Sequence, residues 1–189
     1  MAIHAVIFDL YGVLGLNGWQ DFKMRHFDGR WDAWEPLRVL GQKVDAGEAT
    51  DDEFVAALSA ATGESKQAVR YSFEHTRPNT ELLQFIQNNL RGYKIGLLSN
   101  ASHDVLPHLF TEKERALFDE VMLSVHEGIT KPEASMFHRM CERLDLAPQQ
   151  CILVDDQARH LAAAEQIGMK TVLFTDNTQV TGELMELTR

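Results

Sequence analysis

Short apolar runs alternate with stretches of helical periodicity along most of the chain. Five runs end at a polar or turn residue, and they cover residues 3–8, 93–98, 120–123, 151–154 and 170–174. Apolar side chains recur at helical spacing in residues 80–90, 133–144 and 158–167. Brief apolar strands that alternate with helices predict a parallel sheet joined by right-handed crossovers. The pattern therefore indicates an α/β fold with a Rossmann-like parallel sheet.

Residues 15–78 break this alternation and contain no convincing strand. A helix is compatible with the pattern of residues 31–44. Thr50 and Glu53 have the Thr-x-x-Glu spacing of a capping box, and Ser65 is suited to cap a further helix. We therefore expect a small helical domain at residues 15–78, inserted after the first strand of a core formed by residues 1–14 and 79–189.

Charge and composition restrict the classes of partner. The 189 residues carry a formal net charge of −10, which argues against binding to nucleic acid or to an anionic membrane surface. No apolar run approaches the ~18 residues that a membrane-spanning helix needs, and the first strand does not have the form of a secretory signal. Cys141 and Cys151 show no zinc-site spacing, so we expect reduced, buried thiols and a cytoplasmic location.

Polar residues stand at the carboxyl ends of three predicted strands. Asp9 follows the first strand, Ser99 follows the second, and the pair Asp155 and Asp156 follows the fourth. Each of these residues alone could be a turn or capping residue. In an open parallel sheet, however, the carboxyl ends of the strands meet at one crevice where ligands bind. Together with Lys131, these residues predict a shared site.

Four segments resemble the motifs of the haloacid dehalogenase (HAD) superfamily in their order and spacing. They are residues 9–13 (DLYGV), 97–100 (LLSN), 124–133 (SVHEGITKPE) and 154–156 (VDD). The resemblance extends over nearly the whole chain. It is nearest to the branch with a small helical cap, and within it to glucose-1-phosphate phosphatase-like members and the phosphatase domain of epoxide hydrolases. It implies a HAD core with an α-helical cap after the first strand.

The resemblance implies a phosphatase that acts on a small phosphorylated metabolite such as a sugar phosphate. Asp9 would attack phosphorus and form an aspartyl-phosphate. Ser99, Asn100 and the Tyr11 region would bind the phosphoryl group, and Lys131 would supply positive charge. The implied catalytic residues are therefore Asp9, Ser99 and Lys131. The implied partner is a small phosphate ester, and the oligomeric state is left open.

A magnesium ion is the cofactor that the resemblance implies. Its ligands would be Asp9, the main-chain carbonyl of Tyr11 and Asp156, and Asp155 would be a further ligand or a group that supports the ligands. An electrostatic argument points the same way, because three carboxylates around one crevice, with Lys131 as the only motif cation, do not all stay ionised without compensation. A hard divalent cation with oxygen ligands resolves this repulsion, and phosphate can complete its coordination.

Tyr11 departs from the phosphatase pattern, which usually has a second Asp two residues after the nucleophile. That Asp protonates the leaving group, whereas tyrosine, with a reference pKa near ~10, is a poor general base at neutral pH. Tyrosine at this position is typical of the true haloacid dehalogenases, so dehalogenation is one alternative. A weakly active or non-catalytic binding protein is another. The Asp-Asp pair of the fourth motif indicates a metal site, and we therefore favour phosphoryl chemistry.

Two histidines and the tryptophans of the inserted segment leave further choices open. His103 could replace the missing acid or simply cap a helix. His160 stands where several relatives have Asn; it could pair with Lys131 or a substrate, or lie on a helix surface, which we favour. Trp31 and Trp34 fit the buried face of a cap helix. Trp19 lies in the expected loop after the first motif and is the preferred substrate-specificity residue.

Overall fold

The computed structural model describes residues 2–27, 29–45, 49–101 and 104–188. The chain forms two compact units, which are described separately. Met1–Gly15 and Pro78–Arg189 form the first, here called the sheet unit, and Leu16–Arg77 form the second, here called the helical unit.

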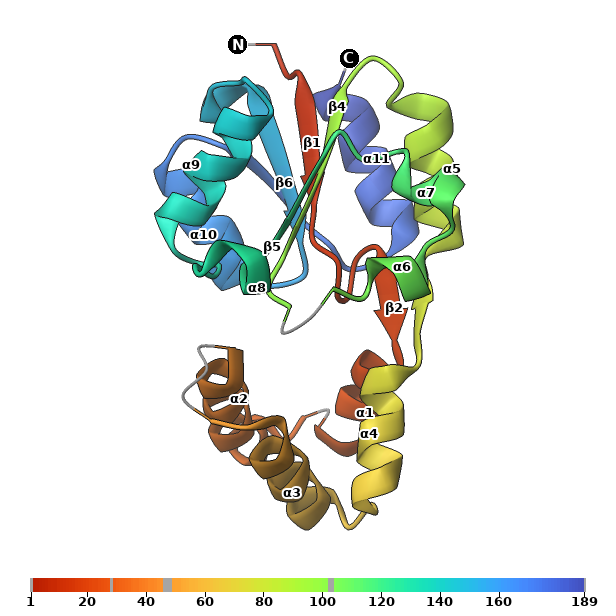
Figure 1. Cartoon of the computed structure of the whole chain (residues 1–189), viewed down its shortest axis with the longest axis vertical. Coiled ribbons are helices and arrows are strands. Elements are labelled where there is room, and N and C mark those ends of the chain that lie inside the picture. The colour runs from red at the N-terminus through yellow and green to blue at the C-terminus, as the bar shows by residue number, and fades with distance from the viewer. Residues whose placement is uncertain (1, 28, 46–48, 102–103, 189) are drawn as a thin grey trace. The chain divides into compact units, whose positions relative to one another are not determined.

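A five-stranded sheet with the order β5-β4-β1-β6-β7 forms the centre of the sheet unit (Figure 1). Its strands are β1 (Ala5–Phe8), β4 (Lys94–Ser99), β5 (Glu120–Leu123), β6 (Cys151–Asp155) and β7 (Lys170–Leu173). All four neighbouring pairs are parallel. The five strands lie at the five predicted apolar runs, so the prediction of a parallel α/β sheet is confirmed.

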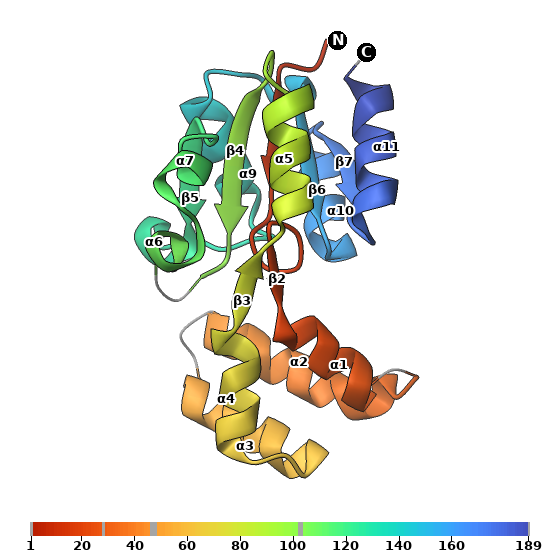
Figure 2. The same ribbon diagram turned by 90° about the vertical axis from the view of Figure 1, so that its right-hand side faces the viewer.

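Helices cover both faces of this sheet (Figures 1 and 2). One face packs against α5 (Thr80–Asn89) and α11 (Asn177–Leu187), and the other against α9 (Ala134–Arg143) and α10 (Ala158–Gln166). Successive side chains of a strand point to opposite faces. Val6 and Phe8 accordingly join the first apolar cluster, whereas Ala5 and Ile7 join the second.

Short helices complete the connections of the sheet unit. They are α6 (Leu106–Leu109), α7 (Glu112–Arg115), α8 (Ser124–Glu127) and the 3-10 turn Pro148–Gln150.

The helical unit consists of α1 (Gly18–Phe27), α2 (Trp31–Asp45), α3 (Asp51–Thr62) and α4 (Lys66–Glu74). The predicted capping box is present at the start of α3, where the Thr50 side chain accepts from the Glu53 main-chain N–H and Glu53 accepts from the Thr50 main chain. Ser65 caps α4 as expected. These helices enclose a separate apolar cluster that includes Phe22, Phe27, Leu37, Val55, Leu58 and Val69.

Two details of this region correct the prediction from sequence. Residues 15–78 do contain strands, because β2 (Gly15–Asn17) pairs with β3 (Thr76–Pro78). Three-residue strands are too short to show an alternating pattern. Residue 19 lies in α1 rather than in a loop. The buried apolar residues of α1 whose side chains the structure describes, Phe22 and Phe27, are five positions apart, and this spacing is not the i, i+3, i+4 stripe that indicates a helix.

Two expectations from composition, on the cysteines and on membrane-spanning helices, can be compared with the structure. Cys141 and Cys151 are buried and are not joined by a disulfide. Within the described ranges, no helix combines the length and the apolar character required to cross a bilayer.

Gly96 lets α9 approach the centre of β4 closely. A Cβ atom at Gly96 would lie 3.0 Å from Cγ1 of Ile7 and 3.2 Å from Sδ of Met140, whereas a Cβ at Gly182 in α11 would meet nothing within 4 Å. β4 ends at the predicted site residue Ser99, and the loop that contains Lys131 precedes α9, so this contact joins two elements that are adjacent in sequence to predicted site residues.

We expect opposite effects from the same substitution at these two glycines. Gly96→Ala should lower the free energy of unfolding by about 1–3 kcal/mol, because the buried neighbours must move. Gly182→Ala should raise it by up to about 1 kcal/mol, because alanine is favoured over glycine in an exposed helix. Urea unfolding monitored by circular dichroism measures both changes, and equal effects at the two positions would contradict the packing argument.

Candidate active site at the carboxyl edge of the sheet

Three buried polar residues meet where adjacent strands end. Asp9 follows β1, Ser99 ends β4 and Asp155 ends β6, and all three side chains are buried. Because β1 lies between β4 and β6 in the sheet, their carboxyl ends are neighbours. The turn after Asp9 uses Gly12 at φ +87°, a conformation that favours glycine. The convergence that the strand pattern predicts is therefore present.

Lys131 joins two of these strand ends. Its ammonium Nζ lies 2.9 Å from Oδ1 of Asp9 and 2.6 Å from Oδ2 of Asp155, and its side chain has no exposed surface. Burial alone would lower the pKa of Lys131, but the two carboxylates outweigh this effect and raise the pKa above its ordinary value. Lys131 therefore stays a cation inside the protein.

The two carboxylates that share Lys131 differ in their electrostatic surroundings. Burial would raise the pKa of Asp155, but Lys131 and His160 hold it below its ordinary value. Burial raises the pKa of Asp9 well above its ordinary value, and although Lys131 opposes this shift, the charges of Asp155 and Asp156 add to it. The cluster therefore has more negative charge than Lys131 can balance, and an additional cation would favour the ionised form of Asp9.

Asn100 holds the main chain of Lys131 in place. The Asn100 amide donates to the Lys131 carbonyl oxygen at 2.9 Å, and its oxygen accepts from the Lys131 N–H at 2.8 Å. Ser124 fixes the segment after β4 that contains Asn100, since the Ser124 Oγ accepts from the Ala101 N–H at 2.9 Å. Both polar atoms of the Asn100 side chain thus contact the Lys131 main chain and position the lysine, while the predicted binding of phosphate by Asn100 stays a prediction.

His160 corrects the interpretation that we favoured from sequence. It is buried, with 1% of its surface exposed, instead of lying on the surface of α10. Its Nδ1 lies 3.0 Å from both Oδ1 and Oδ2 of Asp155. The available sequence signal was the position of His160 five residues after Asp155, in the first turn of a helix, where it can face back toward the end of the strand.

The remaining predicted residues lie in different surroundings. Tyr11 is partly buried and packs against the apolar cluster of one sheet face. Asp156 directly follows β6 and raises the pKa of Asp9 through its charge. Trp19 belongs to α1 of the helical unit, and its side chain lies outside the described part of the structure. His103 also lies outside the described residues.

The chemistry of the donor set suits a hard divalent cation. Carboxylate oxygens of Asp9 and Asp155 and a ring nitrogen of His160 lie within 4.8 Å of one another. This group differs from the predicted ligand set, because it contains His160 in place of Asp156 and the Tyr11 carbonyl. The His160 Nδ1 already contacts both Asp155 oxygens. Mg²⁺ prefers oxygen ligands, so the carboxylates are better suited to it than the imidazole nitrogen, and the ligand set of Asp9, Asp155, Asp156 and the Tyr11 carbonyl stays a prediction.

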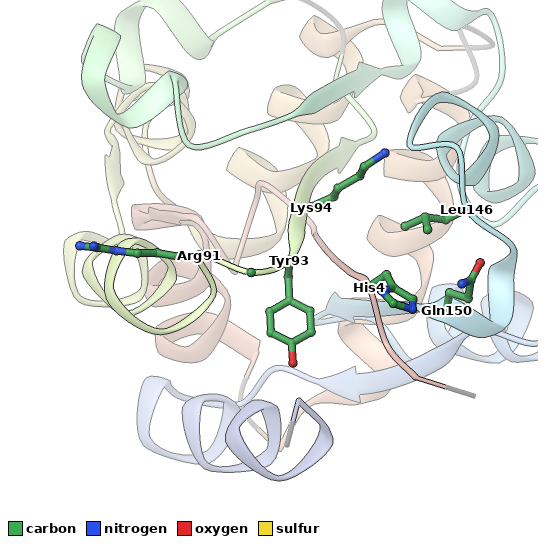
Figure 3. A pocket seen from close by; sticks show the side chains of 7 residues that line it. His4, Arg91, Tyr93, Lys94, Leu146 and Gln150 are labelled. Carbon is green, nitrogen blue, oxygen red and sulfur yellow. The ribbon is translucent and has the colours of Figure 1, made fainter.

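A pocket of about 430 Å³ in the sheet unit lies away from this cluster (Figure 3). It is lined by His4, Tyr93, Lys94 and Gln150, among others, which precede or begin β1, β4 and β6. It thus lies at the amino ends of the strands, opposite the edge that carries Asp9. Lys94 donates to the Leu144 carbonyl oxygen at 2.6 Å, so its ammonium serves the local structure.

Removal of the Lys131 charge should destabilise the protein strongly. Lys131→Met leaves two buried carboxylates without their shared cation, and we expect a loss of about 3–5 kcal/mol in the free energy of unfolding near pH 7. The loss should shrink toward pH 4. Without Lys131 the folded-state pKa values of both carboxyls rise, so the folded variant binds protons that the unfolded chain does not hold.

The measurement is urea unfolding of wild type and variant between pH 4 and pH 8. Lys113→Met, at an exposed position, is the matched control and should change stability by less than about 0.5 kcal/mol. If Lys131→Met lowers the free energy of unfolding only slightly, or by an amount that does not change with pH, the buried carboxylates do not need this ammonium for stability.

Comparisons with known proteins identify the family of the chain. Residues 3–168 match a family model described as haloacid dehalogenase-like hydrolase. The chain is 26% identical to a drimenol cyclase of Aspergillus calidoustus over 83% of its own length, but it spans only 34% of that relative. It is 24% identical to a sesquiterpene phosphatase of Aspergillus oryzae, over 97% of this chain and 95% of the relative.

A solved structure shows the same fold. It is a HAD family enzyme of Bacteroides thetaiotaomicron in complex with magnesium and inorganic phosphate, with a TM-score of 0.62, 21% identity, and coverage of 92% of this chain and 95% of that one. The family match extends over all four strand-end segments of the site. This chain belongs to the haloacid dehalogenase-like hydrolase family.

Proposed function

We propose that this hydrolase is a Mg²⁺-dependent phosphatase of a small phosphorylated metabolite, with Asp9 as the nucleophile. The observation that carries the proposal is the buried contact of one ammonium, that of Lys131, with the carboxylates of Asp9 and Asp155. A cationic group beside a carboxylate nucleophile is suited to receive a phosphoryl group, whose negative charge it offsets.

The contacts of Asp9 leave one of its oxygens for the reaction. Within the described residues, the recorded hydrogen bonds and ion pairs of this side chain fall on Oδ1, which accepts from the Leu10 N–H at 2.6 Å and contacts Lys131 Nζ at 2.9 Å. Both contacts fix the plane of the carboxylate. Oδ2 is therefore the oxygen that would attack phosphorus, while the Lys131 ammonium and Ser99 Oγ bind phosphoryl oxygens. The bond between phosphorus and the ester oxygen would break, and the alcohol would leave with a proton from water. A water molecule would then attack phosphorus of the aspartyl-phosphate, which releases inorganic phosphate and restores Asp9.

Magnesium would be held by Asp9, Asp155, Asp156 and the main-chain carbonyl of Tyr11. When bound, it would supply positive charge that neutralises the carboxylates and the phosphate. Burial raises the Asp9 pKa, and the charges of Asp155 and Asp156 raise it further; this local excess of negative charge supports the assignment, and so does the related enzyme whose structure contains magnesium and phosphate.

The helical unit is the part to which we assign substrate recognition. It is inserted in the chain between β1 and the rest of the sheet unit, and Trp19 of α1 is our candidate specificity residue. The names of two relatives refer to terpenoid chemistry, namely a drimenol cyclase and a sesquiterpene phosphatase. A small phosphate ester, for which a sugar phosphate or a terpenoid phosphate is a suitable test compound, is the substrate class that we propose.

Tyr11 supports one alternative function. A halide leaves without a proton, so a tyrosine in place of a carboxyl would not hinder a dehalogenase. In that reaction Asp9 would attack carbon instead of phosphorus. The acidic residues Asp155 and Asp156 favour the phosphatase, because an additional negative charge has no evident use in halide release.

The first test is hydrolysis of para-nitrophenyl phosphate with and without Mg²⁺. Its leaving group departs readily without an acid, so Tyr11 does not limit the assay. We expect turnover that is lost with a chelator and restored by Mg²⁺. Asp9→Asn should lower kcat by at least about 1,000-fold, as expected for loss of a nucleophile.

Asp145→Asn is the matched control for this substitution. Asp145 is exposed and has φ +54°, a conformation that Asn adopts as readily as Asp. Turnover that survives in Asp9→Asn would contradict the proposal. Metal-independent chloride release from 2-chloropropionate would favour the dehalogenase, and absence of both activities would favour a binding protein.

Magnesium should also stabilise the folded chain in the absence of substrate. Binding at 100 times Kd adds about 2.7 kcal/mol to the free energy of unfolding, so thermal unfolding should move to higher temperature with MgCl₂. Asp156→Asn should lose most of this shift, whereas Asp145→Asn should keep it. NaCl at equal ionic strength is the control, and an equal shift with NaCl would argue against a specific metal site.

A further inference from the structure

We propose that His160 is a positioning residue of the active site, which holds the Asp155 carboxylate in the orientation that places Lys131 beside Asp9. The kinetic part of this inference rests on the proposed phosphatase function, and its structural part stands on the contacts alone.

Three donors hold the Asp155 carboxylate from different sides. Lys131 Nζ contacts Oδ2 at 2.6 Å, and the Gln157 N–H donates to Oδ1 at 2.8 Å. The His160 Nδ1 lies 3.0 Å from both oxygens. A carboxylate held by Lys131 and Gln157 alone could still tilt about its Cβ–Cγ bond, and the imidazole restricts that motion.

The effect of His160 on the reaction would be indirect. Its contact is with Asp155, and Asp155 in turn holds the ammonium that lies 2.9 Å from Asp9. A shift of the Asp155 carboxylate would move that ammonium away from the nucleophile. Misplacement of a charged group by a fraction of an ångström is enough to reduce an enzyme's turnover.

The other nitrogen of the ring indicates that His160 is not simply core packing. Among the described residues, the buried Nε2 of His160 has no hydrogen-bond partner. An apolar side chain would fill the same space without burying an unsatisfied nitrogen. The only polar contact recorded for this ring in the described residues is that of Nδ1 with Asp155, so this contact is the function that we assign to the imidazole.

Two substitutions separate positioning from packing. In His160→Asn the side-chain amide lies at the same distance from the main chain as Nδ1 and can donate to Asp155. In His160→Gln the amide lies one bond farther out, where Nε2 is now, although glutamine is nearer to histidine in volume. A packing role therefore predicts that Gln is the better replacement, and a positioning role predicts that Asn is.

We expect His160→Gln to lower kcat for para-nitrophenyl phosphate at least tenfold with KM within twofold of wild type. His160→Asn should stay within about threefold of wild type in kcat. His138→Gln, at an exposed position on α9, is the matched control and should not change either constant. Circular dichroism and thermal unfolding establish that each variant is folded.

Two kinetic outcomes would overturn the proposal. Activity in His160→Gln equal to or above that in His160→Asn would show that volume matters and the Nδ1 contact does not. An equal, large loss of kcat in both folded variants would show that Nε2 itself takes part in the reaction, which would make His160 a catalytic residue.

A stability comparison tests the structural part without any turnover. Unfolding midpoints are measured for two sets of variants. The first set is His160→Gln, Lys131→Gln and the double variant of the two, and the second set has His160→Asn in place of His160→Gln. If His160 acts on Lys131 through Asp155, the changes in stability of the single variants should not add up to that of the double variant in the first set, and should nearly do so in the second. Additive shifts in both sets would overturn the proposal. Absence of wild-type turnover would instead contradict the phosphatase function alone.

Discussion

The buried ammonium of Lys131, shared between Asp9 and Asp155, is the interaction on which the candidate site depends. It joins a loop to the ends of two adjacent strands at distances of 2.9 and 2.6 Å, without contact with solvent. One cation cannot neutralise all the carboxylates around it, because Asp156 adds to the negative charge. The cluster is therefore stable enough to be buried and still attracts further positive charge. This electrostatic excess connects the structure of the site with its proposed metal and phosphate chemistry.

The parallel sheet supplies the rigid support for this cluster. β1 lies between β4 and β6, so residues distant in sequence reach one edge with their backbone fixed on both sides by strand pairing. Further residues then orient the charged groups. Asn100 holds the main chain of Lys131, and His160 and the Gln157 N–H hold the carboxylate of Asp155. The main chain of Lys131 and the carboxylate of Asp155 are thus held by neighbours to which no reacting role is assigned.

Much of this arrangement was predictable from local patterns. Each strand of the main sheet coincides with an apolar run, and Asp9, Ser99 and Asp155 stand at strand ends as expected. Weaker patterns failed. The three-residue strands β2 and β3 have too few positions to show alternation, and the buried apolar residues described for α1, Phe22 and Phe27, are five positions apart. His160 was misjudged because a histidine in the first turn of a helix can face solvent or the sheet, and its sequence neighbours do not decide between the two.

The sequence by itself determined the five strands of the main sheet, the helices α5, α9 and α10, the capping of α3 and α4, and the polar residues that reach the carboxyl edge of the sheet. These features follow from periodicity and from hydrogen bonds between residues close in the chain. Only the tertiary structure decided which of these residues touch. The contacts of Lys131 with Asp9, of Asn100 with Lys131 and of His160 with Asp155 depend on side-chain direction and on the burial that neighbouring elements impose. Burial raises the pKa of both Asp9 and Asp155, but Lys131 and His160 bring that of Asp155 below its ordinary value, so two chemically identical side chains are shifted in opposite directions.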